Sequence, residues 1–243
     1  DRLDMDGVGC GARFERVEGR VDGSYRDEWG VEYREGAEAV AHPVRGPIAS
    51  REDAEAYRPP DPGAPHRLGA LPDLVRRYKG RRAICFHHRA AFMWAAYLMG
   101  IDQLMMTMAT EPELAHLVMD KVLATNMEIV RRAVRAGAEV IVLGDDYAAN
   151  NGPMFSPAMF REFITPKLTA MIDLIHKEGA QAIKHSDGNI YPILEDIVGC
   201  GPDGINPVEP VAGMDLKTVK QLVGDRVCIT GNIDCARLLT YGT

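Results

Sequence analysis

The chain has 243 residues, of which 46% are hydrophobic and 26% are charged, and this composition excludes a wholly disordered protein. The formal net charge of −7 includes no block of basic residues, so a nucleic-acid-binding face is not expected. No apolar run approaches the ~18 residues of a membrane span, and no signal-peptide pattern is visible. The 5 cysteines are odd in number and widely spaced, so we expect reduced thiols and a cytoplasmic protein.

The N-terminal part of the chain has its own pattern. Residues 13–23 alternate apolar with charged side chains and are interrupted by glycines, which predicts short antiparallel strands with one face in water. The prolines within residues 59–65 predict a stiff connector. We therefore expect one domain over residues 1–243, with a hairpin region and connector at 1–66 and strand–helix units at 67–243.

Beyond the connector, segments with the apolar, β-branched pattern of buried strands alternate with helices. The strands are expected at 83–87, 138–145, 181–187, 204–208 and 226–231. A capping box at 110–113 is expected to open the longest helix. Ser156 and Pro157 begin a helix that ends near Gly179, and Asp215 caps another that ends near Val223.

Repeated strand–helix units predict a parallel sheet, either closed as a (β/α)8 barrel or open and doubly wound. The strands that the sequence predicts are too few for a complete barrel. We therefore expect an α/β fold of the (β/α)8, TIM-barrel type that is incomplete. It would have about five or six parallel strands and would lack parts at both ends of the chain.

Each predicted strand ends in side chains that titrate, bind metals or donate hydrogen bonds. In parallel α/β folds such ends meet at one edge of the sheet, so the coincidence predicts an enzyme. His87 and His88 point to opposite faces of their strand, so at most one of them faces the interior. The candidates are His87, His88, Asp145, Asp146, His185, Asp187, Asn206, Glu209 and Asn232.

Two pairs among these residues leave alternatives open. His185 and Asp187 lie on one face of an extended segment, which suits two metal ligands or a base with its orienting acid. Asp145 and Asp146 either raise one another's pKa in a partly buried rim or merely cap a turn.

Four separated motifs resemble the uroporphyrinogen decarboxylase superfamily and occur in the family's order. They are S-P-x-x-F-x-x-F-x-x-P from residue 156, K-H-S-D-G-N from 184, P-x-x-G-M-D from 210 and T-G-N-I-D from 230. The resemblance runs from about residue 29 to the last residue. It implies a (β/α)8 barrel.

The resemblance implies one of two reactions. Members that decarboxylate uroporphyrinogen need no cofactor and bind the pyrrole N–H groups through an Asp, assisted by a Tyr and a His. Corrinoid-linked methyltransferases hold zinc through His-x-Cys and a later Cys. Tyr97 matches the family Tyr, the pyrrole-binding Asp falls near residues 1–6, and the late His and last Cys lie beyond Thr243. His185 matches the metal-binding His, whereas Asp187 stands where the first zinc Cys would be.

The match at His185 favours methyl transfer between a small methylated substrate and a corrinoid carried by a partner protein. The substrate would be an aryl methyl ether or a methylated thiol or alcohol. Zinc is expected on His185 and Asp187, with Glu209 or Asp145, and would act as a Lewis acid. We expect the protein to bind neither nucleic acid nor a membrane, and it could form a homodimer. Catalytic roles fall to Asp145, Asp146, His185, Asp187 and Tyr97, and substrate-binding roles to His87, Asn206, Glu209 and Asn232.

Two alternatives remain. A uroporphyrinogen decarboxylase of porphyrin and haem biosynthesis would work without a cofactor, and Arg13, Arg16 and Arg89 are the arginines nominated to hold its substrate's carboxylates. An inactive or truncated relative would expose unpaired strand edges and apolar faces, and would be unstable or oligomeric.

Overall fold

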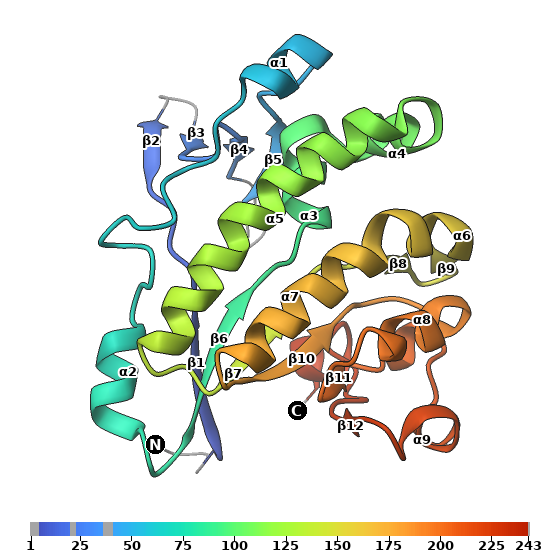
Figure 1. Ribbon diagram of the computed structural model, residues 1–243. Helices are drawn as coiled ribbons and strands as arrows, with labels where there is room; N and C mark the ends of the chain where they lie inside the picture. Colours follow the sequence, from blue (N-terminus) through green and yellow to red (C-terminus); the bar gives the residue numbers. More distant parts are fainter. Residues whose placement is uncertain (1–4, 20–22, 36–40, 243) are drawn as a thin grey trace.

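The computed structural model describes residues 5–19, 23–35 and 41–242. Its centre is a 6-stranded parallel sheet in the order β1-β6-β7-β10-β11-β12 (Figure 1). Strand order follows chain order without the reversal of a doubly wound sheet, so the barrel alternative is favoured. The predicted α/β class and every predicted strand are confirmed. The strands are β1 (Gly7–Gly11), β6 (Ala83–His88), β7 (Val140–Leu143), β10 (Gln181–His185), β11 (Gly204–Asn206) and β12 (Cys228–Ile229).

The strand of the parallel sheet that the sequence did not predict is β1. Its alternate glycines carry no apolar side chain, so the strand pattern is invisible in the sequence. Parallel pairing with β6 holds it, with Gly9 opposite Cys85 and Gly11 opposite His87. A Cβ atom on Gly9 would lie 2.9 Å from Nε2 of His87, so this imidazole packs against bare backbone.

Helices cover one face of the sheet. In Figure 1, α2 (Leu71–Tyr78), α5 (Pro112–Arg135) and α7 (Thr165–Lys177) lie along it, and α5 packs against α7. Side chains alternate along each strand, so one set of residues is buried against the helices and the other lies on the opposite face. Ile84 and Phe86 of β6 belong to the buried set.

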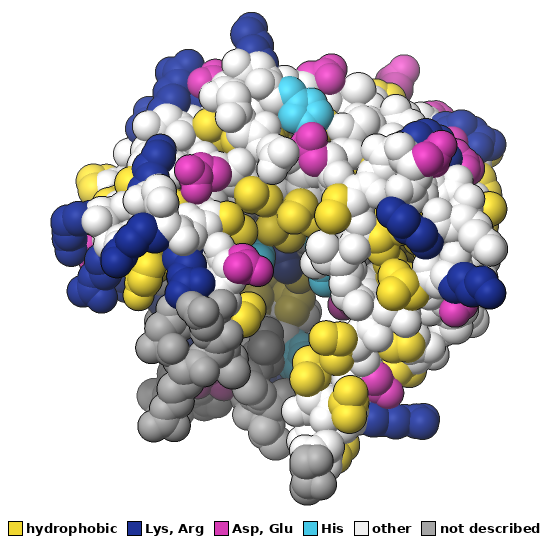
Figure 2. All heavy atoms as spheres, turned by 90° about the horizontal axis from the view of Figure 1, so that it is seen from below, with side chains coloured by type: hydrophobic (Ala, Val, Ile, Leu, Met, Phe, Trp, Pro, Cys, Tyr) yellow, Lys and Arg dark blue, Asp and Glu magenta, His cyan; other side chains and the backbone are white. Residues whose placement is uncertain are grey.

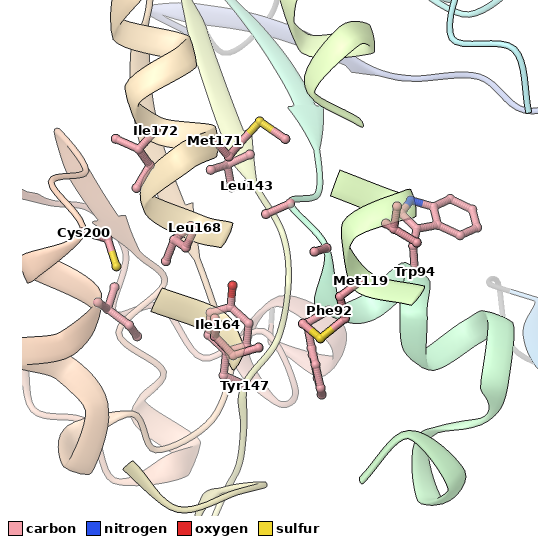
Figure 3. Packing of buried hydrophobic residues seen from close by; sticks show 14 of the residues in the cluster. Phe92, Trp94, Met119, Leu143, Tyr147, Ile164, Leu168, Met171, Ile172 and Cys200 are labelled. Atoms are coloured by element: carbon pink, nitrogen blue, oxygen red, sulfur yellow. The ribbon is translucent and has the colours of Figure 1, made fainter. Parts of the chain in front are cut away.

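The core between the sheet and the helices is apolar. Figure 3 shows Leu168, Met171 and Ile172 of α7 beside Leu143 of β7, and all four side chains are fully buried. Burying a side chain of this size stabilises a protein by about 1.5–3 kcal/mol. This layer therefore fixes β7 and β10, the two strands that carry most of the candidate site.

The long helix α5 does not begin with the predicted capping box. The preceding helix α4 (Ile101–Thr110) runs through Thr110, whose hydroxyl donates to the backbone oxygen of Met106. Thr110 is therefore already helical and cannot act as an N-cap, and Glu111 takes that position without a side-chain hydrogen bond.

The other predicted helix boundaries are confirmed. Ser156 Oγ accepts from the N–H of Met159 at the start of α6 (Pro157–Met159), which continues through a π-helical turn into α7 and ends at the left-handed Gly179. Asp215 caps α9 (Leu216–Val223). The remaining helices are α1 (Arg51–Ala56), α3 (Phe92–Met99), α8 (Leu194–Gly199) and α10 (Leu238–Tyr241).

The predicted N-terminal strands are also present as a separate antiparallel sheet. It has the order β2-β3-β4-β5, and residues 20–22 of the predicted hairpin lie outside the described residues. A two-stranded ribbon, β8 (Ala148–Ala149) with β9 (Gly152–Pro153), follows β7. Among the helices described, none is long and apolar enough to cross a membrane. The four N-terminal strands are β2 (Arg16–Gly19), β3 (Ser24–Asp27), β4 (Glu32–Arg34) and β5 (His42–Arg45).

Candidate active site

A cavity of about 490 Å³ opens at the carboxyl ends of the parallel strands. His87, Asp146, His185 and Asn206, from four successive strand ends, contribute to its wall. In Figure 2 the molecule is hollowed near its centre, and histidine side chains (cyan) are visible inside the hollow. The fold thus brings together polar residues that lie far apart in the sequence.

Asp146, His185 and Asp187 form a cluster at this cavity. Nε2 of His185 lies 3.5 Å from Oδ1 of Asp146 and 3.7 Å from Oδ1 of Asp187. Oδ1 of Asp146 also accepts a hydrogen bond of 3.0 Å from the backbone N–H of Asp187. The interaction with His185 holds the pKa of Asp187 below its ordinary value, which keeps this carboxylate ionised at neutral pH.

The donor atoms of this cluster fit a metal ion. One imidazole nitrogen and two carboxylate oxygens lie within 4.8 Å of one another. Bonds of about 2.1 Å in tetrahedral geometry would separate zinc ligands by about 3.4 Å. The two distances from His185, 3.5 and 3.7 Å, are close to that value. Asp146 and His185 also line the cavity, so a ligand in the cavity can reach this donor set.

Two of the residues considered as ligands lie outside this cluster. Oε2 of Glu209 accepts a hydrogen bond of 2.7 Å from the backbone N–H of Gly188. Asp145 is completely buried and accepts hydrogen bonds from the backbone N–H groups of Ala90 and Met93, at 2.5 and 2.8 Å, near the start of α3. Asp145 therefore anchors a turn, which is one of the two roles that the sequence left open, and Asp146 takes the third place in the cluster.

The two histidines at the end of β6 differ as strand alternation predicts. His88 is buried, and its Nε2 lies 3.0 Å from Oδ1 of Asn126, whose Nδ2 donates to the backbone oxygen of Ala90. Burial lowers the pKa of His88 to about 3, so the ring is neutral at physiological pH. His87 lies on the opposite face of the strand and lines the cavity.

The remaining candidates are not members of the cluster, although Asn206 lies opposite His185 on the neighbouring strand. The buried Oδ1 of Asn206 accepts no hydrogen bond from the described residues. Nδ2 of Asn232 donates to the backbone oxygens of Val208 and Met214 at 2.6 and 3.0 Å, so this amide joins two loops. Tyr97 lines a second, neighbouring cavity of about 330 Å³. The substrate-binding and catalytic roles given to these residues stay predictions.

Sequence reasoning assigned no role to Lys184, although it lies between the strands that carry the cluster. Its side chain is fully buried, and Nζ donates to the backbone oxygens of Leu143 and Asp145 at 3.2 and 2.6 Å. Burial lowers its pKa to about 8. The sequence could have indicated this role, because Lys184 lies two residues after Ala182 and so points to the same buried face of β10. Lys184 ties the end of β7 to β10 and so supports Asp146 and His185.

The position expected for the family's pyrrole-binding Asp does not reach the cavity in the described part of the chain. Asp6 precedes β1, and its backbone oxygen accepts from the N–H of Ala83 at the amino end of β6. It therefore lies at the opposite end of the sheet from the cluster, so the expectation is wrong for this residue. The reason is β1, the unpredicted strand. Residues 1–4 lie outside the described residues.

Comparisons with known proteins agree with this fold. The family model described as "Uroporphyrinogen decarboxylase (URO-D)" matches residues 28–243. A uroporphyrinogen decarboxylase of Chlorobium luteolum is 32% identical over 145 residues, which cover 56% of this chain and 36% of the relative. That of Trichlorobacter lovleyi is 24% identical over 210 residues, which cover 80% of this chain and 58% of the relative. The chain thus spans about a third to three fifths of the length of these relatives.

A solved structure, described as a methyltransferase from Methanosarcina mazei, has the same fold. It superposes with a TM-score of 0.71 at 22% sequence identity, and the match covers 85% of this chain and 60% of that chain. The family match and this fold confirm the α/β architecture of the TIM-barrel type. The chain belongs to the uroporphyrinogen decarboxylase (URO-D) family.

Proposed function

We propose that this chain forms the catalytic barrel of an enzyme that transfers a methyl group from a small methylated compound to a corrinoid carried by a partner protein. The observation that supports this proposal is the cluster of Asp146, His185 and Asp187, whose donor atoms lie within 4.8 Å of one another beside a cavity. Asp146, His185 and Asp187 would hold zinc. A metal-free decarboxylase has no need of such a donor set.

In this reaction the bond between the methyl carbon and its oxygen or sulfur would break, and the reduced Co(I) corrinoid of the partner protein would supply the electron pair of the new bond to the methyl carbon and so become Co(III). The electron pair of the broken bond stays on the departing oxygen or sulfur, which a proton from water then neutralises. Zinc would supply a Lewis acid that draws electron density from the departing atom. Phe14 and Trp94 in the cavity wall would exclude water from the substrate, while His87 and Asn206 would orient it.

Decarboxylation is the second candidate, because the curated relatives carry that name and one is 32% identical over 145 residues. Asp146 and Asp187 would then face pyrrole N–H groups, and His185 would be a hydrogen-bonding wall residue. The match covers 36% of that relative, and the structural match at 22% identity shows the fold alone.

A methyl-transfer assay with and without zinc tests the proposal. The purified chain is given 4-methoxybenzoate as methyl donor and reduced cobalamin as a substitute for the corrinoid protein, and methylcobalamin is followed spectroscopically. We expect formation of methylcobalamin to stop after chelation and to return when zinc is added. Full activity in the metal-free protein, or loss of carboxyl groups from uroporphyrinogen without metal, would contradict it.

A further inference from the structure

Arg89 lies in the wall of the candidate site without a counter-charge among the described residues. It follows β6 directly, and no carboxylate of the described residues lies within ion-pair distance of it. Its Nε is buried and donates no hydrogen bond to any of the same residues. Leaving a buried donor unpaired costs free energy, so such a group in a cavity wall is suited to binding a ligand atom.

Arg89 lines both cavities. The first, of about 490 Å³, contains Asp146 and His185 in its wall, and the second, of about 330 Å³, contains Tyr97. The two walls share Arg89 with Phe14 and Trp94. A ligand that reaches Arg89 can therefore extend from there toward the cluster.

Three aromatic side chains share the cavity walls with this guanidinium: Phe14, Trp94 and Tyr97. The Arg89 guanidinium carbon lies 5.6 Å from the ring centroid of Tyr97. The rings of Phe14 and Trp94 meet edge to face with centroids 5.1 Å apart, and Trp94 stands in the same arrangement to Tyr97 at 5.5 Å. Aromatic side chains in a cavity wall favour contact with an aromatic ring of a ligand.

The other charged groups of the second cavity are already neutralised or bonded. Nη1 of Arg16 lies 2.7 Å from Oε1 of Glu35. Oδ1 of Asp27 accepts hydrogen bonds from the backbone N–H groups of Trp29 and Val31 at 2.9 and 3.0 Å. Among the described residues, Arg89 is thus the cation in this wall that remains available to bind an anionic ligand.

We propose that Arg89 binds the carboxylate of an aromatic substrate, whose ring lies against Phe14 and Trp94 and whose methylated atom points toward Asp146 and His185. The substrate class is an aromatic acid with a methoxy group on its ring. This inference rests on the proposed function for the direction of the substrate, but the recognition of an aromatic carboxylate stands by itself. A planar guanidinium suits a carboxylate because it donates two parallel hydrogen bonds.

Binding measurements on the whole chain test the proposal without any turnover. Calorimetry compares 4-methoxybenzoate with 4-methoxybenzyl alcohol, which has the same ring and methoxy group but no charge. Charge-assisted hydrogen bonds predict that the wild-type protein binds the acid roughly ten- to hundredfold more tightly than the alcohol. Arg89→Gln should remove this preference and leave the affinity for the alcohol unchanged, and Arg89→Lys should keep part of it.

Arg161→Gln is the matched control, because Arg161 lies outside the walls of both cavities and its Nη1 is 2.9 Å from Oδ2 of Asp196. It should change the affinity for the acid by less than about twofold. Equal affinity of the wild-type protein for both compounds, no saturable binding of the acid, or an unchanged preference in a folded Arg89→Gln variant would overturn the proposal.

The outcomes separate this inference from the proposed function. Arginine-dependent binding of the acid without methyl transfer would leave the subsite correct and the reaction wrong. Zinc-dependent methyl transfer that does not depend on Arg89 would leave the reaction correct and the subsite wrong.

Discussion

At the scale of single residues, environment decides what each candidate can do. His87 and His88 are neighbours in sequence, yet His87 lines the cavity and His88 is buried beside Asn126. Asp145 and Asp146 differ in the same way, because Asp145 accepts hydrogen bonds from backbone N–H groups and Asp146 faces His185. Because side chains alternate along a strand, residues that are neighbours in sequence are expected to face opposite sides. The sequence does not show which member of the Asp145–Asp146 pair faces the cavity.

The buried imidazole of His88 predicts a pH dependence of stability. Burial lowers its pKa to about 3 in the folded protein, whereas an unfolded histidine has a pKa of about 6.5. Between these values the unfolded state binds more protons, so the free energy of unfolding falls as the pH drops below about 6.5 and His88 adds no slope above it.

His88→Gln removes this titration, and urea unfolding at several pH values measures the effect. Below pH ~6, the wild-type protein should lose up to about 1.4 kcal/mol more per pH unit than the variant. Parallel stability curves for the two proteins would show that His88 is not held neutral by the fold.

At the scale of elements, the loop after β10 carries Asp187 and depends on one glycine. Gly188 has a φ of +85°, and a Cβ atom there would lie 2.4 Å from the backbone oxygen of Ala148. Its N–H donates to Glu209, so the same residue joins this loop to the one after β11. Only glycine satisfies both requirements.

Gly188→Ala should therefore destabilise the protein more than Gly179→Ala does. Gly179 has a comparable φ of +92° at the end of α7, but a Cβ atom there meets nothing within 4 Å. Both variants pay the left-handed backbone strain of about 1 kcal/mol, and Gly188→Ala adds the steric overlap, a further ~1–3 kcal/mol. Equal unfolding free energies of the two variants would contradict this account of the loop.

Elements were predictable from sequence where side chains carry the pattern. The strands after residue 68 and the helix caps at Ser156 and Asp215 were predicted because burial and capping leave local signatures. β1 was not, because its glycines are held by pairing with β6, which is a long-range property. Thr110 was misassigned because the sequence does not show that α4 continues to it.

At the scale of the whole molecule, parallel topology assembles the site. Asp146 follows β7, and His185 ends β10, two neighbouring strands in the sheet. The sequence indicated that strand ends would meet and that His185 and Asp187 share a face. It did not choose Asp146 over Glu209 as their neighbour, because that choice depends on how the loops after β7 and β11 fold. That Arg89 has no carboxylate partner among the described residues is likewise visible only once its surroundings are known.

The most direct test of the account is the metal content of the purified protein, measured by plasma mass spectrometry for the wild type, His185→Ala and His176→Ala. His176 is the control, because its Nε2 lies 2.8 Å from Oδ2 of Asp203, a pair outside the cluster. The account predicts near-stoichiometric zinc in the wild type and in His176→Ala, and its loss in His185→Ala. A wild-type protein that binds no zinc even after incubation with the metal, or a His185→Ala variant that keeps it, would contradict the central claim.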